Sequence, residues 1–274
     1  MTLATDVRWL ALVLLVGCGR LSFDALGGSG ADDASATGDA PLGSDAPSAI
    51  DGAVTGGDGG TNPDLLVWLS FEENPADIIV NLGSLPTAVT CVTTCPVQVP
   101  GTTGNGVSFN GTSDAIRIAD HPALRRASGT IAAYVWVRSL PATSSYQVFL
   151  GRAFGMTGAN TWELFFHNDG NGTTINSGGD ASSPSYVIAP WTTVGGWRHV
   201  AATWSPTTQQ LFLDGTLVGS ASSFTAAYDD RDIIVGADEQ QLGQFDFFFD
   251  GILDDVRIYN RVLTQLEVTM LVTI

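Results

Sequence analysis

The feature that most constrains this chain is a series of short apolar segments that begins at Leu65 and continues almost to the C-terminus. Glycine, proline, asparagine or aspartate separates each segment from the next, and no helical period appears before Thr264. The segments comprise residues 65–71, 106–120, 130–140, 146–154, 161–168, 199–205, 210–220, 232–238 and 252–260. Parallel βαβ units are excluded because the chain has no crossover helices. The sequence therefore predicts an all-β fold, a two-sheet antiparallel β-sandwich.

Two local signals accompany this pattern. Leu213-Asp214-Gly215 is an Asp-Gly hairpin signal between two apolar runs. The T-x-x-E pattern from Thr264 to Glu267 is a capping box and predicts one short helix at the end of the chain. We also expect the first strand to lie near the last, so that the two ends of the head meet at one side.

Strict alternation along the last strand, 252–259, would place four side chains on one face: Ile252, Asp254, Val256 and Ile258. Asp254 would then share its face with three branched apolar residues and be partly buried. A buried carboxylate needs hydrogen-bond donors or a metal ion.

Several blocks occur in the order found in a known family of sandwiches. They are Gly106–Leu124, Trp136-Val137, Gly196–Trp204, Leu211–Gly215, Ile234–Gly236 and Phe249–Leu263. Together they resemble the strands of bacterial laminin-G-like domains, which are concanavalin A-like lectin/glucanase jelly rolls. The chain departs from that pattern in having Asn110 for Asp, Ala115 for Tyr and Arg198 for His. The resemblance implies a jelly-roll head over residues 64–274.

The N-terminus has the organisation of a bacterial lipoprotein. Trp9–Val16 is an apolar run of signal-peptide length, far short of the ~20 residues that span a bilayer. Leu15-Val16-Gly17-Cys18 resembles the lipobox, which implies that residues 1–17 are cleaved and that Cys18 is acylated. An ordinary signal peptide, or a buried helix with a chance cysteine, is the alternative. Because Gly19 follows the cysteine, the resemblance predicts a lipid-anchored protein of the cell envelope, at the outer membrane or cell surface.

Residues 18–63 are rich in Gly, Ala, Ser, Asp, Thr and Pro and have no periodicity. Such a segment cannot bury enough apolar surface to offset its conformational entropy, so we expect a disordered acidic tether. A flexible spacer of this length has a root-mean-square span of roughly 35 Å. The tether would hold the head away from the membrane.

Two cysteines remain after Cys18, and they are separated by three residues. Cys91 and Cys95 have a short, metal-like spacing, but no second cysteine pair or histidine cluster accompanies them. In an oxidising exterior we expect them to form a disulfide.

A calcium site is the cofactor that the resemblance implies. A structural Ca²⁺ would lie near the first and last strands, with oxygen ligands from Glu72, Asn110, Gly111 and Asp254. Without calcium, Asp254 would be bonded to backbone N–H groups or to an arginine, and this alternative stays open.

Candidate ligand-binding residues come from one strand and from possible rim loops. Glu163 and His167 lie at i, i+4 on one face of strand 161–168, with Phe165 between them; two polar residues beside an apolar face are the simpler interpretation. Polar loops at 155–160, 168–185 and 238–247 would form a rim with exposed aromatic residues, for which the candidates are Trp191, Phe245 and Phe247.

The glucanase pattern E-x-D-x-E of the family and the serine motif G-x-S-x-G are absent. We therefore expect a non-catalytic surface module that binds a carbohydrate or an extracellular protein. A glycan-active hydrolase or lyase, or a structural surface domain, is the alternative. A net charge of −17 argues against nucleic acid as a partner and favours a soluble monomer, attached to the membrane only through its lipid.

Overall fold

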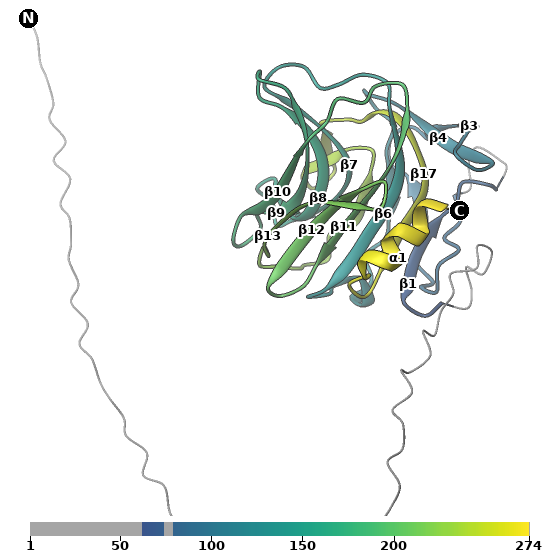
Figure 1. Ribbon diagram of the computed structural model, residues 1–274. Coiled ribbons are helices and arrows are strands. Elements are labelled where there is room, and N and C mark those ends of the chain that lie inside the picture. The colour runs from purple at the N-terminus through teal and green to yellow at the C-terminus, as the bar shows by residue number, and fades with distance from the viewer. Residues whose placement is uncertain (1–61, 74–78, 274) are drawn as a thin grey trace, which may run out of the picture. The chain divides into compact units, whose positions relative to one another are not determined.

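The apolar segments form two antiparallel sheets that face each other in a computed structural model, which describes residues 62–73 and 79–273 (Figure 1). The larger sheet has eight strands. Their order is β13 (Thr216–Ser222), β12 (Thr208–Leu213), β11 (Trp197–Trp204), β6 (Gly129–Val137), β17 (Asp250–Tyr259), β4 (Asn105–Asn110) and β3 (Val97–Pro100), with β1 (Leu65–Leu69) also paired to β17. The pairing of β1 with β17 confirms that the first strand lies beside the last.

The second sheet has seven strands. Their order is β10 (Ser185–Pro190), β9 (Thr173–Gly179), β8 (Ala159–Asn168), β7 (Ser145–Phe154), β14 (Ile233–Val235), β5 (Ile116–Ile118) and β2 (Val89–Cys91). A separate hairpin is formed by β15 (Asp238–Gln241) and β16 (Gln244–Asp246). Every strand-to-strand ladder among the described residues is antiparallel, so the predicted sandwich is confirmed.

The helices are short. The 3₁₀ turns are Pro122–Leu124 and Leu271–Thr273, and α1 is Gln265–Met270. Thr264 is the N-cap of α1, and the reciprocal bonds with Glu267 that define a capping box are both present, as predicted. No helix among residues 62–73 and 79–273 is long and apolar enough to span a membrane.

The core lies between the two sheets. Trp162 of β8 stacks on Trp204 of β11 across the sandwich, with ring centroids 6.0 Å apart. Phe149 of β7 meets Phe249, which precedes β17, at 6.0 Å. These large rings belong to one cluster of buried apolar residues supplied by both sheets. Their burial is the main favourable contribution to folding.

The predicted alternation of the last strand is wrong beyond Asp254. Asp255 has φ 53°, and the register of β17 against β6 shifts between Asp254 and Arg257, so β17 contains a bulge. The extra residue turns Val256 into the core beside Leu253, whereas Asp254 pairs with Tyr134 on the opposite face. Asp254 is nevertheless buried, at 2% exposed, because the loop that precedes β4 covers it.

The polar stretch 168–185 is not one long loop, as expected, but contains β9 and the first residue of β10. Likewise β8 begins at Ala159, and most of 238–247 is the β15–β16 hairpin. In β9 only Ile175 carries a large apolar side chain, so its sequence lacks the alternation that identified the other strands. By contrast, the predicted Asp-Gly turn between β12 and β13 is present, with φ 47° at Asp214 and 74° at Gly215.

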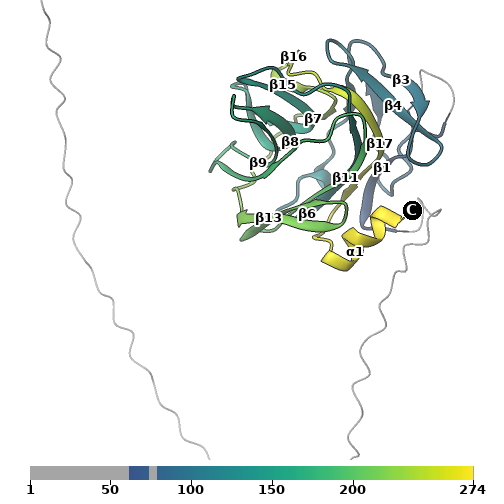
Figure 2. The same cartoon turned by 45° about the horizontal axis from the view of Figure 1, so that its top comes forward.

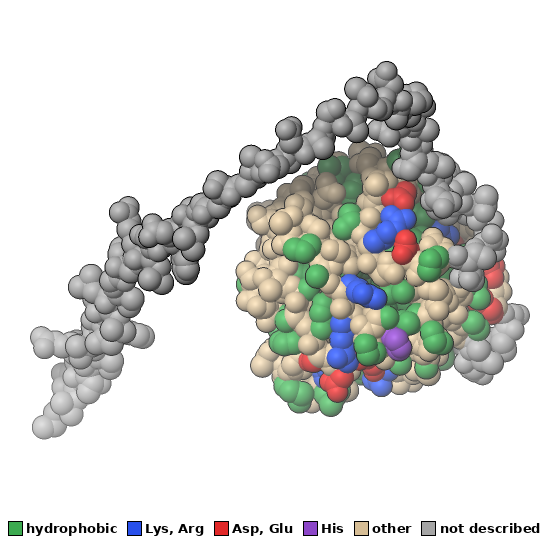
Figure 3. All heavy atoms as spheres, turned by 90° about the horizontal axis from the view of Figure 1, so that it is seen from below, with side chains coloured by type: hydrophobic (Ala, Val, Ile, Leu, Met, Phe, Trp, Pro, Cys, Tyr) green, Lys and Arg blue, Asp and Glu red, His purple; other side chains and the backbone are tan. Residues whose placement is uncertain are grey.

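Arginine and carboxylate side chains lie next to each other on the face shown in Figure 3. Over the whole of the described residues, nine ion pairs join an arginine to an aspartate or glutamate. In the pair of Arg231 and Glu239 both side chains are buried, at 6% and 3% exposed. Arg152, which is 0% exposed, binds Asp120 and lies over the ring of Tyr228. The predicted signal peptide (1–17), Cys18 and nearly all of the tether (18–63) lie outside the described residues, so these remain predictions.

Candidate functional site

The two faces of β8 differ in chemistry. Trp162, Leu164 and Phe166 point into the core, whereas Glu163, Phe165 and His167 point to the opposite side. We call this opposite side, turned away from the eight-stranded sheet, the outer face of the seven-stranded sheet. The predicted pair Glu163 and His167 lies on it, with Phe165 between them.

Glu163 is held by two neighbours on the outer face. Its Oε2 accepts a hydrogen bond from Nδ2 of Asn160 at 3.2 Å, and its Oε1 accepts one from the hydroxyl of Tyr186, on β10, at 3.1 Å. The side chain is buried, and the charges of Asp180 and Asp238 act on it. The sequence identified Glu163 as a candidate ligand-binding residue, but it identified none of these four neighbours.

Burial raises the pKa of Glu163 to about 8, and the charges of Asp238 and Asp180 add to this effect. Burial likewise raises the pKa of Asp238 to about 6. The pKa of Tyr186 is also raised, first by burial and then by Glu163. At pH 7, therefore, Glu163 is mostly a neutral acid that can donate a hydrogen bond, while Asp238 is mostly ionised.

An array of rings adjoins this carboxyl group. Tyr146 of β7 stacks on His167, with centroids 4.4 Å apart and planes inclined by 10°. Tyr146 also meets Phe165 at 5.8 Å, and Phe165 meets Tyr186 edge-on at 5.7 Å. We call these residues, together with Phe247, which lies edge-on to Tyr146 at 5.3 Å, the aromatic platform. Tyr146 is 38% exposed, so the platform has a solvent-facing ring.

The β15–β16 hairpin lies beside β7 (Figure 2), and Phe247 of the aromatic platform follows directly after β16. The hairpin supplies Asp238 to the neighbourhood of Glu163. Of the predicted aromatic residues, Phe247 joins the platform, whereas Phe245 packs with Phe248 against the small apolar cluster of Ala115, Ile234 and Ala237.

Trp191 was predicted to be an exposed ligand-binding residue, and this is wrong. It is 2% exposed and packs on Phe166 in the core, with centroids 4.9 Å apart. Its indole Nε1 donates to the carbonyl oxygen of Thr193 at 2.7 Å, which satisfies its polar atom inside the protein. The flanking Pro190 and Thr192 are exposed, which is why the sequence around Trp191 resembles a surface loop.

The four predicted calcium ligands do not meet at one point. Oδ2 of Asp254 accepts bonds from the backbone N and the hydroxyl of Thr102, at 2.8 and 2.7 Å. The carboxylate of Glu72 accepts bonds from the backbone N of Asn105 at 3.1 and 3.2 Å. Asn110 and Gly111 lie at the other end of β4. No group of three or more His, Cys, Asp or Glu in residues 62–73 and 79–273 is arranged to hold a metal ion.

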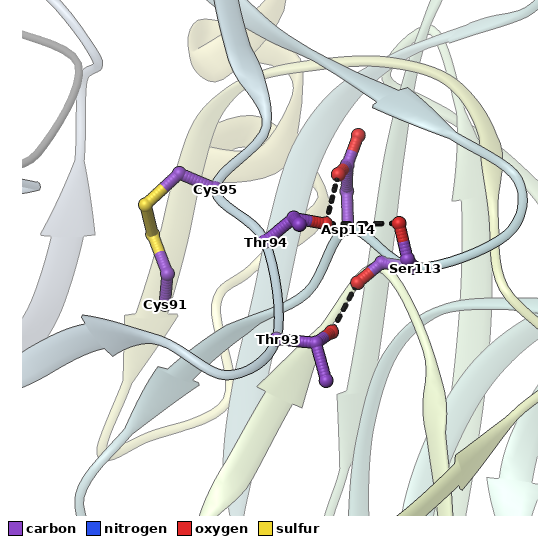
Figure 4. The surroundings of a disulfide bond; sticks show 6 residues. All are labelled: Cys91, Thr93, Thr94, Cys95, Ser113 and Asp114. Carbon is purple, nitrogen blue, oxygen red and sulfur yellow. Dashed lines mark hydrogen bonds between the residues drawn. A yellow bond between two sulfur atoms is a disulfide. The ribbon is translucent and has the colours of Figure 1, made fainter.

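Cys91 and Cys95 form the predicted disulfide (Figure 4). The loop that it closes is held to the start of β5 by threonine hydroxyls: Thr93 bonds the carbonyl oxygen of Ser113, and Thr94 bonds Oδ1 of Asp114 at 2.6 Å. This arrangement fixes an edge of the seven-stranded sheet, away from Glu163.

Comparison with known proteins identifies the head. The sequence profile of the concanavalin A-like lectin/glucanases superfamily, of the laminin-G type, matches residues 110–269. No curated protein matches the sequence significantly.

Several solved structures share the fold. Domain 4 of AbnA, an extracellular GH43 arabinanase from Geobacillus stearothermophilus in complex with arabinotriose, is 21% identical, with a TM-score of 0.58; the alignment covers 76% of this chain and 98% of that domain. The binding domain of Paraclostridial Mosquitocidal Protein 1 is 18% identical (TM-score 0.59, 76% of this chain, 52% of the other). Trypanosoma rangeli sialidase, in complex with the inhibitor DANA, is 18% identical (TM-score 0.56, 76% of this chain, 32% of the other). At these identities the likeness shows the fold alone.

Proposed function

This chain belongs to the concanavalin A-like lectin/glucanases superfamily, and from that premise we propose that its sandwich is a non-catalytic module that binds carbohydrate at the cell surface. A fold of this kind carries many functions, so the proposal depends on the site. The observation that carries it is the exposed ring of Tyr146, stacked on His167 next to the hydrogen-bonded pair of Glu163 and Tyr186.

The two parts of the site suit the two surfaces of a sugar. Aromatic rings stack on the C–H face of a pyranose, and carboxyl, phenol and amide groups bond its hydroxyls. Domain 4 of AbnA was solved with arabinotriose, and this supports a saccharide as the ligand class. An extracellular protein is the alternative ligand, and it would use the same exposed rings.

Catalysis is not part of the proposal. Hydrolysis of a glycosidic bond requires two carboxyl groups that reach the bond from either side. Glu163 and Asp238 are only 9% and 4% exposed. A glycosidic bond between two bulky sugar rings therefore cannot come between these two carboxyl groups. Incubation of oligosaccharides with the protein should release no new reducing ends.

A binding screen tests the function. We expect the full-length protein to bind members of a glycan array, and Tyr146→Ala to weaken the strongest of these interactions by about 1–2 kcal/mol, as for the loss of one stacking ring. Val97→Ala, which removes an exposed apolar side chain from β3 of the other sheet, is the matched control and should leave binding unchanged. Absence of binding to every glycan would contradict the proposal and leave a protein ligand or a structural role.

For the N-terminus we propose acylation at Cys18 and attachment to the cell envelope through residues 18–63. Support comes from the lipobox-like Leu15–Cys18 and the short apolar run before it. Expression in a bacterium with a radiolabelled fatty acid tests this: wild type should be labelled and found with membranes, and Cys18→Ser should be neither. Label on both proteins, or on neither, would contradict acylation at this residue.

A further inference from the structure

Three carboxyl groups gather beside the aromatic platform. Glu163 lies on β8, Asp180 follows β9 and Asp238 begins β15; we call them the acidic cluster. Asp180 accepts a bond from the backbone N of Asn160 at 2.7 Å, and Asn160 donates to Glu163 from its side chain. Gln240 donates to Asp238. The cluster is thus assembled around Asn160 from three separate elements.

No arginine neutralises the acidic cluster. None of the nine ion pairs among the described residues includes Glu163, Asp180 or Asp238. Charged groups that are buried are ordinarily paired. Asp180 and Asp238 add to the rise in the pKa of Glu163, as expected for carboxyl groups that lie near one another without a cation between them.

A second observation points to a missing donor. Asn160 is 3% exposed, and its Oδ1 has no hydrogen-bond partner. Buried amide oxygens are normally bonded, so this one is available to a donor that reaches the cluster. Together with the carboxylates it forms a set in which acceptors outnumber donors. An ammonium group, with three donors and no acceptor, is the complement of such a set.

We propose that the outer face of β8–β10 selects glycans that carry a protonated amine, such as glucosamine oligomers, and that the acidic cluster confers this selectivity. The inference rests on the proposed carbohydrate-binding function. The ammonium group would approach Asp180 and Tyr186, which are partly exposed, with Glu163 and Asp238 behind them. The rings of Tyr186 and Phe165 add an attraction for a cation near their faces. Uronic and sialic acids would be repelled.

Calorimetry with matched hexasaccharides at pH 6 tests the selectivity. We expect a β-1,4-linked glucosamine hexamer to bind the full-length protein at least about tenfold more tightly than its fully N-acetylated counterpart, because acetylation removes the charge. Asp180→Asn should reduce this preference to near unity. Asp169→Asn, an exposed acid at the other end of the same sheet, should preserve it.

Proton release provides a second readout that bulk attraction to an acidic protein would not produce. A bound ammonium favours the ionised form of Glu163, so wild type should release up to about one proton per glucosamine hexamer, measured in buffers of different ionisation enthalpy. When the same hexamer binds Glu163→Gln, markedly fewer protons should be released. Circular dichroism and a melting curve show that each variant is folded.

The outcomes separate the two proposals. If the acetylated hexamer binds as tightly as the glucosamine hexamer, or more tightly, the proposed selectivity is wrong. If Tyr146→Ala still weakens binding in that case, the proposal of carbohydrate binding is retained. If Asp180→Asn and Asp169→Asn lose the preference for the glucosamine hexamer to the same extent, the attraction is nonspecific. That result also overturns the proposed selectivity. No binding of any saccharide overturns both.

Discussion

The hydroxyl of Tyr186 reaches across β9 and donates a hydrogen bond to Glu163, 23 residues earlier in the chain, at 3.1 Å. This bond joins the aromatic platform to the acidic cluster, since the ring of Tyr186 also packs edge-on against Phe165. A change in the ionisation of Glu163 therefore acts on a ring of the platform. If the proposed ligand binds at this face, its binding should be coupled to the protonation of Glu163 through this residue pair.

The stability of the protein should depend on pH through Glu163. Its pKa is about 8 in the folded protein and 4.5 in an exposed carboxyl group, so the folded state holds the extra proton between these values. The contribution of Glu163 is present below pH 4.5 and is lost as the pH rises through 8. Its full extent is about 5 kcal/mol. Chemical denaturation at a series of pH values should therefore show the free energy of unfolding of wild type, measured relative to that of Glu163→Gln, falling between pH 4.5 and 8.

The raised pKa of Asp238 also makes the free energy of unfolding fall as the pH rises, but over a lower pH range, from 3.8 to about 6. This contribution is expected to remain in Glu163→Gln. The difference between the two proteins therefore isolates Glu163. Asp169→Asn is the control and should follow wild type above pH 5. A Glu163→Gln curve that parallels wild type from pH 4.5 to 8 would show that the carboxyl group is ionised in the folded protein.

The strands that the sequence predicted are those with large apolar residues at alternate positions. β8 is an example, with Trp162, Leu164 and Phe166 directed to the core. β9 was missed because Thr, Asn, Ser and Gly fill most of its positions, and its identity as a strand comes from ladders with β8 and β10 on its two sides. These ladders join strands that follow one another in the chain, but β9 lacks the alternation of large apolar and polar residues by which a strand is identified from sequence.

The same distinction applies to the site. Glu163 and His167 were found together because they are four residues apart on one strand. Their partners were not found, because Tyr146, Tyr186 and Asp238 come from other elements and are ordinary polar or aromatic residues in their own segments. The prediction that Trp191 is exposed is wrong for the opposite reason. Its neighbours in sequence are exposed, but its own ring is buried in the core.

The capping box of α1 gives a prediction for the C-terminus. Arg261 binds the carboxylate of Glu267 and lowers its pKa to about 2, and Thr264 contributes to this shift. Glu267→Ala should cost about 1 kcal/mol, because the ion pair is partly exposed and the cap loses one of its two bonds. Hydrogen exchange should speed up in α1 and not in β8. The contribution is present above pH 4.5 and is lost as the pH falls towards 2, so wild type and variant should converge in strong acid; a constant difference would contradict an ionic origin.

Asp254 tests the calcium prediction. Its Oδ2 is already bonded to the backbone N and hydroxyl of Thr102, so we expect Asp254→Ala to lower the free energy of unfolding by about 2 kcal/mol in the presence of either calcium or a chelator. Ser220→Ala, at an exposed polar residue of β13, is a control with a small expected effect. A melting temperature that rises with calcium in wild type and not in Asp254→Ala would establish a calcium site that includes this carboxylate.

His199 should limit the stability of the protein in acid. It lies under the C-terminal segment: its ring packs edge-on against Tyr134, at 5.0 Å, and the hydroxyl of Tyr134 donates to the carbonyl oxygen of Val272 at 2.9 Å. Burial lowers the pKa of His199 to about 4, and the charge of Arg257 acts in the same direction. The imidazole is therefore neutral in the folded protein, and its Nδ1 has no hydrogen-bond partner.

Between pH 6.5 and 4 the unfolded chain binds a proton at His199 that the folded protein does not. The contribution of His199 to the free energy of unfolding should therefore fall as the pH falls through this range, by about 3 kcal/mol in total. His199→Phe keeps an aromatic ring against Tyr134 and removes the titration, so denaturation curves should show a gentler loss of stability in acid than for wild type. His121→Phe, at a partly exposed histidine before β6, is the matched control and should keep the wild-type slope. If His199→Phe lost stability in acid as steeply as wild type, another group would have to account for the pH dependence.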